Sequence, residues 1–333
     1  TLERAAAEYE HEVLITPGRE PSAQVLSRLL ASGNRTELYR YTSVLAFDLT
    51  PPTDDRPFFF NQLPLSRPLQ AFAYAQTVLA RGPLGGGVRK GNLVATATLL
   101  VLFLIALILV FGTIVVPLRF ALKDAGVKFV SRGTLYFSLI GAGFMMVEIG
   151  LMQRMSIFLG HPIYSLSVLL FTLILATGLG SLISEKFPLN SRTRISTWAI
   201  VTGTYLIVLP FSLTFWFVTY ANASLAVRIA ICVASVAPAG ILLGFGFPTG
   251  MRVIASIDPA PTPWFWGING AAGVLASITA VALSLALGIN ATLVVGAICY
   301  FLLVPVSLSL LQLKPTPVAK RASKREVKHQ RKR

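Results

Sequence analysis

The chain contains 333 residues, of which 54% are hydrophobic and only 13% are charged. Ordinary soluble domains carry about 25% charged residues, so this composition excludes a water-soluble domain. Long apolar runs after residue 90 predict a multi-pass protein of the lipid bilayer. Much of the net charge of +15 lies in the basic tail, residues 313–333. Behind a hydrophobic segment such a tail indicates a cytoplasmic end beside anionic lipid, and not a nucleic-acid-binding segment.

The first 61 residues are predicted to form a short α/β segment. "HEVLITPG" is typical of a strand that ends in a Pro-Gly turn, "SAQVLSRLLASG" of a capped helix, and "SVLAFDL" of a second strand. A strand–helix–strand unit is too small to bury a core, so we interpret residues 1–61 as the terminal fragment of an α/β domain. No glycine-rich nucleotide loop follows either strand, and no cofactor is expected. Residues 62–92 are expected to be a linker.

The stretch "PPTDDRPFFFN" ends this segment and is the most unusual polar part of the chain. Its two aspartates and its arginine are expected to form a local ion pair. The three phenylalanines that follow are too apolar to remain in water, so we expect them to dock onto the membrane interface or onto the preceding domain. The candidate docking motif comprises Asp54, Asp55, Arg56, Phe58, Phe59 and Phe60.

From residue 93 onward, seven apolar runs have the length of a membrane-spanning helix, which predicts an all-α bundle over residues 93–312. Basic residues crowd the first, third and fifth loops. The positive-inside rule therefore places these loops and the tail in the cytoplasm, and residues 1–90 outside the cell membrane. Arg81, Arg89 and Lys90 oppose this orientation, because they flank the first run on its outer side. The seven runs are 93–116, 134–153, 163–184, 196–218, 225–246, 266–287 and 291–312.

Glu148 lies inside the second run, where an unpaired charge is costly. It shares one helical stripe with Met145 and Met152, so we expect it to face another helix, where it is either protonated or hydrogen-bonded. Two roles are open: a carboxylate that binds a cation or relays a proton, and one that fixes the packing of two helices. The candidate hydrogen-bond partners are Asn269, Ser181 and Thr177.

Other polar residues complete this candidate intramembrane site. His161 precedes Pro162, which is tolerated in a first helical turn, so His161 is expected to be a cap of the third helix or an interface residue, and not a ligand. No second histidine or carboxylate stands at ligand spacing from it, and no metal is expected. The site comprises Glu148, Gln153, Arg154, His161 and Asn269.

Two glycine-rich stretches, "TGLGS" and "GFGFPTGMR", lie within or at the end of predicted helices. Small residues let helices approach closely, and we favour that role; a helix broken at Pro248 that lines a transport site is the alternative. In "PWFWGINGAAG", Trp264 and Trp266 are expected at the membrane interface, and Asn269 is expected to link two helices. The glycines of this stretch are expected to form a close-packing face: Gly267, Gly270 and Gly273.

Three stretches in this order, "PPTDDRPFFF", "MVEIGLMQRMSIFLGHPIYSLSV" with "TGLGS", and "WGINGAAGVLAS", resemble the membrane-bound spermidine/spermine-synthase-like proteins. The resemblance, over residues 40–290, implies a Rossmann-type synthase domain, aminopropyltransferase- or methyltransferase-like, joined in cis or in trans to a multi-span membrane region. In that family the "DDRPFFF" element connects the synthase domain to the membrane region. The family's glycine-rich loop and acidic substrate-binding residues are absent here, so no catalytic residue is assigned, and enzymatic activity of this chain alone is not expected.

Two functions of different class follow. The first is the membrane domain of a synthase-like protein, which acts as an anchor or as a subunit that binds a membrane-protein partner. The second is a transporter or channel for a polyamine or another cation, with Glu148 as its charged site. A polycation site needs several acids, and apart from Glu148 the spans offer almost none, so we favour the anchor.

Overall fold

The computed structural model describes residues 24–42, 52–58, 98–99, 101–117 and 126–313, and all regular elements in these ranges are helices. Six of them are long and apolar enough to cross a membrane, which confirms the predicted all-α polytopic membrane fold. The first predicted run, 93–116, is described in part and contains a shorter apolar helix, Val101–Gly112, whose end overlaps the π-helical turn η1, Val110–Val115. The six long helices are α7 (Val127–Leu159), α8 (Pro162–Lys186), α9 (Arg192–Thr219), α10 with α11 (Leu225–Ile257), α12 (Thr262–Leu287) and α13 (Ile289–Leu310).

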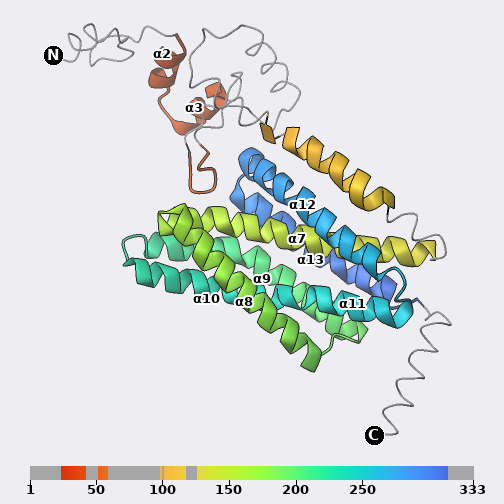
Figure 1. The fold of residues 1–333 in the computed structure, drawn as a ribbon. Coiled ribbons are helices and arrows are strands. Elements are labelled where there is room, and N and C mark those ends of the chain that lie inside the picture. Colours follow the sequence, from red (N-terminus) through yellow and green to blue (C-terminus); the bar gives the residue numbers. More distant parts are fainter. Residues whose placement is uncertain (1–23, 43–51, 59–97, 100, 118–125, 314–333) are drawn as a thin grey trace, which may run out of the picture. The chain divides into compact units, whose positions relative to one another are not determined.

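Helix α7 runs through the middle of the bundle (Figure 1). It packs most extensively against α12 and α13 and also touches α8, α10 and α11. The reason lies in its sequence, because large buried side chains recur at alternating spacings of four and seven residues and form a continuous face: Tyr136, Ile140, Val147, Leu151 and Phe158. Around this face, α8 pairs with α10 and α9 pairs with α13.

The helices extend beyond the apolar runs from which they were predicted. With 33 residues α7 is about 50 Å long, whereas the hydrocarbon core of a bilayer is about 30 Å thick. Lys128, Arg132 and Arg154 lie between the predicted runs and so were expected in loops, but in the structure they belong to α7. That placement was wrong because apolar runs measure the hydrocarbon thickness and not the length of the helix.

The predicted helix break is present, but it falls earlier than expected. A single residue, Phe245, separates the end of α10 (Leu225–Gly244) from the start of α11 (Gly246–Ile257). The break therefore lies at Phe245 and not at Pro248. A proline lacks the N–H that would bond to the carbonyl four residues earlier, so the hydrogen-bond ladder fails at Gly244. Pro248 itself occupies the first turn of α11, where no N–H is needed.

The glycine-rich stretches bring backbones into contact, as the small-residue interpretation predicted. A methyl group at Gly180 would overlap the backbone carbonyl of Ile241, and one at Gly244 would overlap that of Thr177, so α8 and α10 require glycine at both places. The close-packing face predicted on α12 is wrong at Gly270, where a methyl group would meet open space. Trp264, which was expected together with Trp266 at the membrane interface, is buried in the bundle and donates to the Thr134 hydroxyl at 2.6 Å.

The chain divides into two units, and the first of them, Thr1–Pro52 with Phe59–Val94, is described only over α2 (Gln24–Ala31) and α3 (Arg35–Thr42). Helix α2 confirms the helix predicted in "SAQVLSRLLASG". Helix α3 was not predicted, although Asn34 and Glu37 form a reciprocal cap: Asn34 Oδ1 accepts from Glu37 N at 2.9 Å, and Glu37 Oε2 accepts from Gly33 N at 3.1 Å. Both predicted strands, the linker 62–92 and the tail from residue 314 lie outside the described residues.

Candidate functional site

Residues Thr53–Arg56 form a tight turn, named the docking turn here, that belongs to the same unit as the helix bundle. Two backbone hydrogen bonds close it: Thr53 N donates to Arg56 O at 3.2 Å, and Arg56 N donates to Thr53 O at 2.9 Å. The expected local ion pair within this stretch does not form. The side chains of Asp55 and Arg56 bond instead to the ends of two helices. They lie at the end of the bundle where α7 and α12 finish and α13 begins, which we name the docking end.

Asp55 caps the start of α13. Its carboxylate accepts a hydrogen bond from Asn290 N at 2.7 Å, and its backbone oxygen accepts one from Ile289 N at 2.9 Å. The first N–H groups of a helix have no partner within the helix, and a negative charge is stabilised there by the helix dipole. Gly288 allows this approach, because a methyl group on it would overlap the Asp55 carboxylate.

Arg56 occupies the complementary place at the end of α12. Its Nη2 donates to the carbonyl of Ala286 at 3.0 Å. The last carbonyls of a helix lack donors, and a positive charge is favoured beside them. The docking turn thus presents an anion to one helix start and a cation to the neighbouring helix end, so its charge pattern matches the α12–α13 connection.

Arg154 links the docking turn to the inside of the bundle. The side chain is only 3% exposed, its Nη1 donates to the backbone oxygen of Asp54 at 2.9 Å, and its Nη2 donates to the hydroxyl of Thr214 on α9 at 2.5 Å. The guanidinium also lies 5.9 Å from the centre of the Phe217 ring, a cation–π distance. A buried arginine in a membrane protein needs such partners, and here one of them comes from a residue about 100 positions away in sequence.

The predicted intramembrane site is dispersed in the structure. Glu148 is half-buried on α7, and in the described part of the chain it has no hydrogen-bond or ion-pair partner. Two of its three expected partners bond elsewhere: Asn269 Nδ2 donates to Phe137 O at 3.4 Å, and the Thr177 hydroxyl donates to Leu173 O at 2.8 Å. The Asn269 bond does confirm that this residue links α12 to α7.

The remaining members of that set have local roles. His161 caps α8 as predicted, with its Nδ1 accepting from Ile163 N at 3.2 Å and Pro162 in the first turn. Gln153 is half-buried, and its Oε1 has no partner among the described residues. Of the phenylalanines in the candidate docking motif, Phe58 is half-buried, whereas Phe59 and Phe60 lie outside the described residues.

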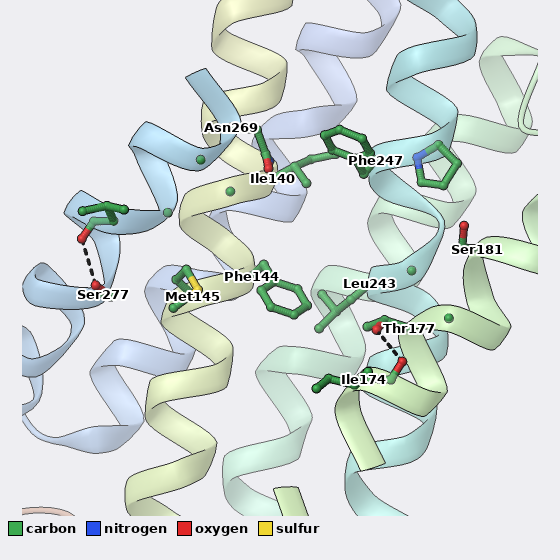
Figure 2. Close-up of a pocket in the computed structure, with 17 residues that line it drawn as sticks. Ile140, Phe144, Met145, Ile174, Thr177, Ser181, Leu243, Phe247, Asn269 and Ser277 are labelled. Atoms are coloured by element: carbon green, nitrogen blue, oxygen red, sulfur yellow. Dashed lines mark hydrogen bonds between the residues drawn. The ribbon is translucent and has the colours of Figure 1, made fainter. Parts of the chain in front are cut away.

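A pocket of about 650 Å³ lies between α7, α8, α12 and the α10–α11 break. Figure 2 shows Phe144 of α7 and Leu243 of α10 near its middle, with Asn269 and Ser277 on the α12 side and Thr177 and Ser181 on the α8 side. Its walls are mostly apolar, and the polar groups are neutral amides and hydroxyls. None of the described residues that line it is acidic, and Glu148 lies one helical turn beyond the nearest wall residues of α7, Phe144 and Met145.

Within the described ranges no three histidine, cysteine or acidic side chains gather in a group that would hold a metal ion. Comparison of the chain with protein-family models, with curated proteins and with solved structures found no match. The role of the chain has to be inferred from its own contacts.

Proposed function

We propose that this integral membrane domain anchors a preceding α/β domain, of the spermidine-synthase-like type that the sequence resemblance implies, and fixes it to the docking end of its helix bundle. The observation that supports this proposal is the docking turn, which bonds to α7, to the end of α12 and to the start of α13. An anchor needs the chain that leaves the preceding domain to arrive at a fixed point, and Asp54, Asp55 and Arg56 provide one.

The orientation of the anchor follows from the distribution of charge. The end of the bundle opposite the docking end carries Lys128, Arg132, Lys186, Arg192 and Arg194. By the positive-inside rule that end faces the cytoplasm, as does the tail, and the docking turn lies on the outer side of the cell membrane.

Protease accessibility tests the anchor and its orientation together. In right-side-out vesicles that contain the full chain, we expect Asp55→Ala to speed cleavage of the docking turn by proteinase K about fivefold, because loss of a helix N-cap costs about 1 kcal/mol. Cleavage of a transiently opened segment follows the population of its open form. Asp54→Ala is the matched control, since Asp54 binds Arg154 through its backbone oxygen and keeps that bond.

Equal cleavage rates for Asp55→Ala and Asp54→Ala would contradict the anchor. Cleavage that occurs only in inverted vesicles would contradict the orientation and leave the anchor intact.

A transporter for a polyamine or another cation is the second candidate function, and the broken helix favours it. Gly244 and Pro248 both line the 650 Å³ pocket, and Pro248 leaves the Gly244 carbonyl without its helical donor. Discontinuous helices supply such free backbone groups to transport sites. Glu148, one turn along α7, would be the charged group nearest this pocket on that helix.

Filling the pocket tests transport. A methyl group at Gly270 meets open space, so Gly270→Leu is expected to fold and to reduce uptake into liposomes at least tenfold if the pocket carries a substrate. Glu148→Gln should have the same effect on a cation. Gly112→Leu is the control, because Gly112 also has open space and does not line the pocket. Wild-type uptake no faster than that of empty liposomes, or uptake unchanged by Gly270→Leu, would remove this second candidate.

A further inference from the structure

A second cavity, of about 340 Å³, lies at the docking end between α7, α9 and α10. Two arginines line it, Arg154 from the last turns of α7 and Arg228 from the first turn of α10. Among the described residues of its lining Asp54 supplies the one carboxylate, and the other walls are apolar: Ile157, Phe158, Phe217, Val218 and Ala221. The charged side chains that line this space, two guanidinium groups and one carboxylate, therefore sum to a net positive charge.

The two guanidinium groups are not satisfied by the described part of the protein. Each carries five N–H donors. Arg154 uses its Nη atoms for Asp54 O and the Thr214 hydroxyl, while Arg228 uses Nη1 for Phe158 O at 2.9 Å. The Nε of both side chains is buried and has no partner among the described residues, and no described carboxylate forms an ion pair with either.

Cations placed in this way require a counter-charge. A charge removed from water is destabilised strongly unless an opposite charge and further hydrogen bonds compensate it, and Arg154 is only 3% exposed. The stacked rings of Phe158 and Phe217, with centroids 3.8 Å apart, wall the cavity with apolar surface and lower the local dielectric. An anion in this space would be held more tightly than at an open surface.

We propose that this cavity binds a phosphate group between Arg154 and Arg228. Guanidinium forks match the oxygens of a phosphate and bind it with charge-assisted hydrogen bonds. The depth of the site suits a phospholipid headgroup: Arg154 lies about 8 Å from the end of α7 at Leu159, and Arg228 lies in the first turn of α10. Inorganic phosphate offers the same oxygens, so the test separates these two sources.

Native mass spectrometry of the purified full chain measures the binding. Phosphatidylglycerol, inorganic phosphate and diacylglycerol are added separately, the last as an apolar control without phosphate. We expect wild-type protein to bind phosphatidylglycerol, and Arg228→Gln to weaken that binding at least tenfold through loss of a charge-assisted contact. Arg192→Gln is the matched control, since Arg192 is an exposed arginine at the opposite end of the bundle.

Each outcome decides the proposal. Binding of phosphatidylglycerol alone assigns the site to a lipid headgroup, and binding of inorganic phosphate as well assigns it to phosphate from either source; both support it. Equal loss in Arg228→Gln and Arg192→Gln, equal binding of diacylglycerol, or no binding of either phosphate compound would overturn it. Arg228→Lys keeps the positive charge but lacks the planar guanidinium group, so it should bind phosphatidylglycerol with intermediate strength. Such binding would show that the weaker binding of Arg228→Gln does not come from misfolding.

Discussion

Alanine in place of Gly288 is expected to destabilise the bundle by about 2–4 kcal/mol and to release the docking turn. Gly288 has φ +101° and ψ 163°, a backbone conformation that is almost confined to glycine and costs about 1–3 kcal/mol for another residue. A methyl group there would also overlap the Asp55 carboxylate, so the cap on α13, worth about 1 kcal/mol, would be lost as well. Thermal unfolding in detergent, followed by tryptophan fluorescence, measures the loss of stability.

Gly160 provides the matched control for this prediction. It too has a positive φ, +78°, but with ψ −2° it is in the left-handed helical region that asparagine tolerates at the end of a helix. A methyl group at Gly160 meets no atom within 4 Å. Gly160→Asn should therefore cost less than about 1 kcal/mol, whereas Gly288→Asn should cost as much as Gly288→Ala. Equal losses at the two glycines would show that neither the backbone conformation of Gly288 nor its contact with Asp55 has the expected effect.

The class of the fold was predictable from the sequence because the thickness of the hydrocarbon core of the bilayer sets the length of the apolar runs. The ends of the helices were not, since polar residues such as Arg132 and Arg154 remain helical once they find partners in the tertiary structure. Arg132, for example, donates to the carbonyl of Ser309 on α13. Such a contact joins residues far apart in the chain, and no local pattern reports it.

The candidate site, too, was predictable from the sequence only in part. The charged stretch Asp54–Arg56 was identified as a docking motif, but its partners were not, because Ile289 and Asn290 carry no sequence signal for an external cap. Arg228 was missed although a signal existed. It stands alone in the apolar run "LAVRIAICVASV", and the physical argument that singled out Glu148 applies equally to a cation in such a run.

The packing of α8 against α10 leads to the second large effect. Gly180→Ala is expected to destabilise the bundle by about 3 kcal/mol, at the upper end of the usual cost of overpacking, because the added methyl group would meet the backbone carbonyl of Ile241. A backbone carbonyl in a helix cannot move aside as a side chain can, so the two helices would have to separate.

Gly178 lies two residues away on the same helix and has no neighbour within 4 Å of an added methyl group. Gly178→Ala should therefore leave stability unchanged or raise it by up to about 1 kcal/mol, since alanine restricts the unfolded backbone more than glycine does. The midpoints of thermal unfolding of the two variants in the same detergent give the comparison. The difference arises from position alone, because both changes add one methyl group to one helix of the same bundle.

If Gly180→Ala proved as stable as Gly178→Ala, the close approach of α8 and α10 would not be a feature of the folded protein. The walls that these two helices contribute to the 650 Å³ pocket would then have to be placed differently.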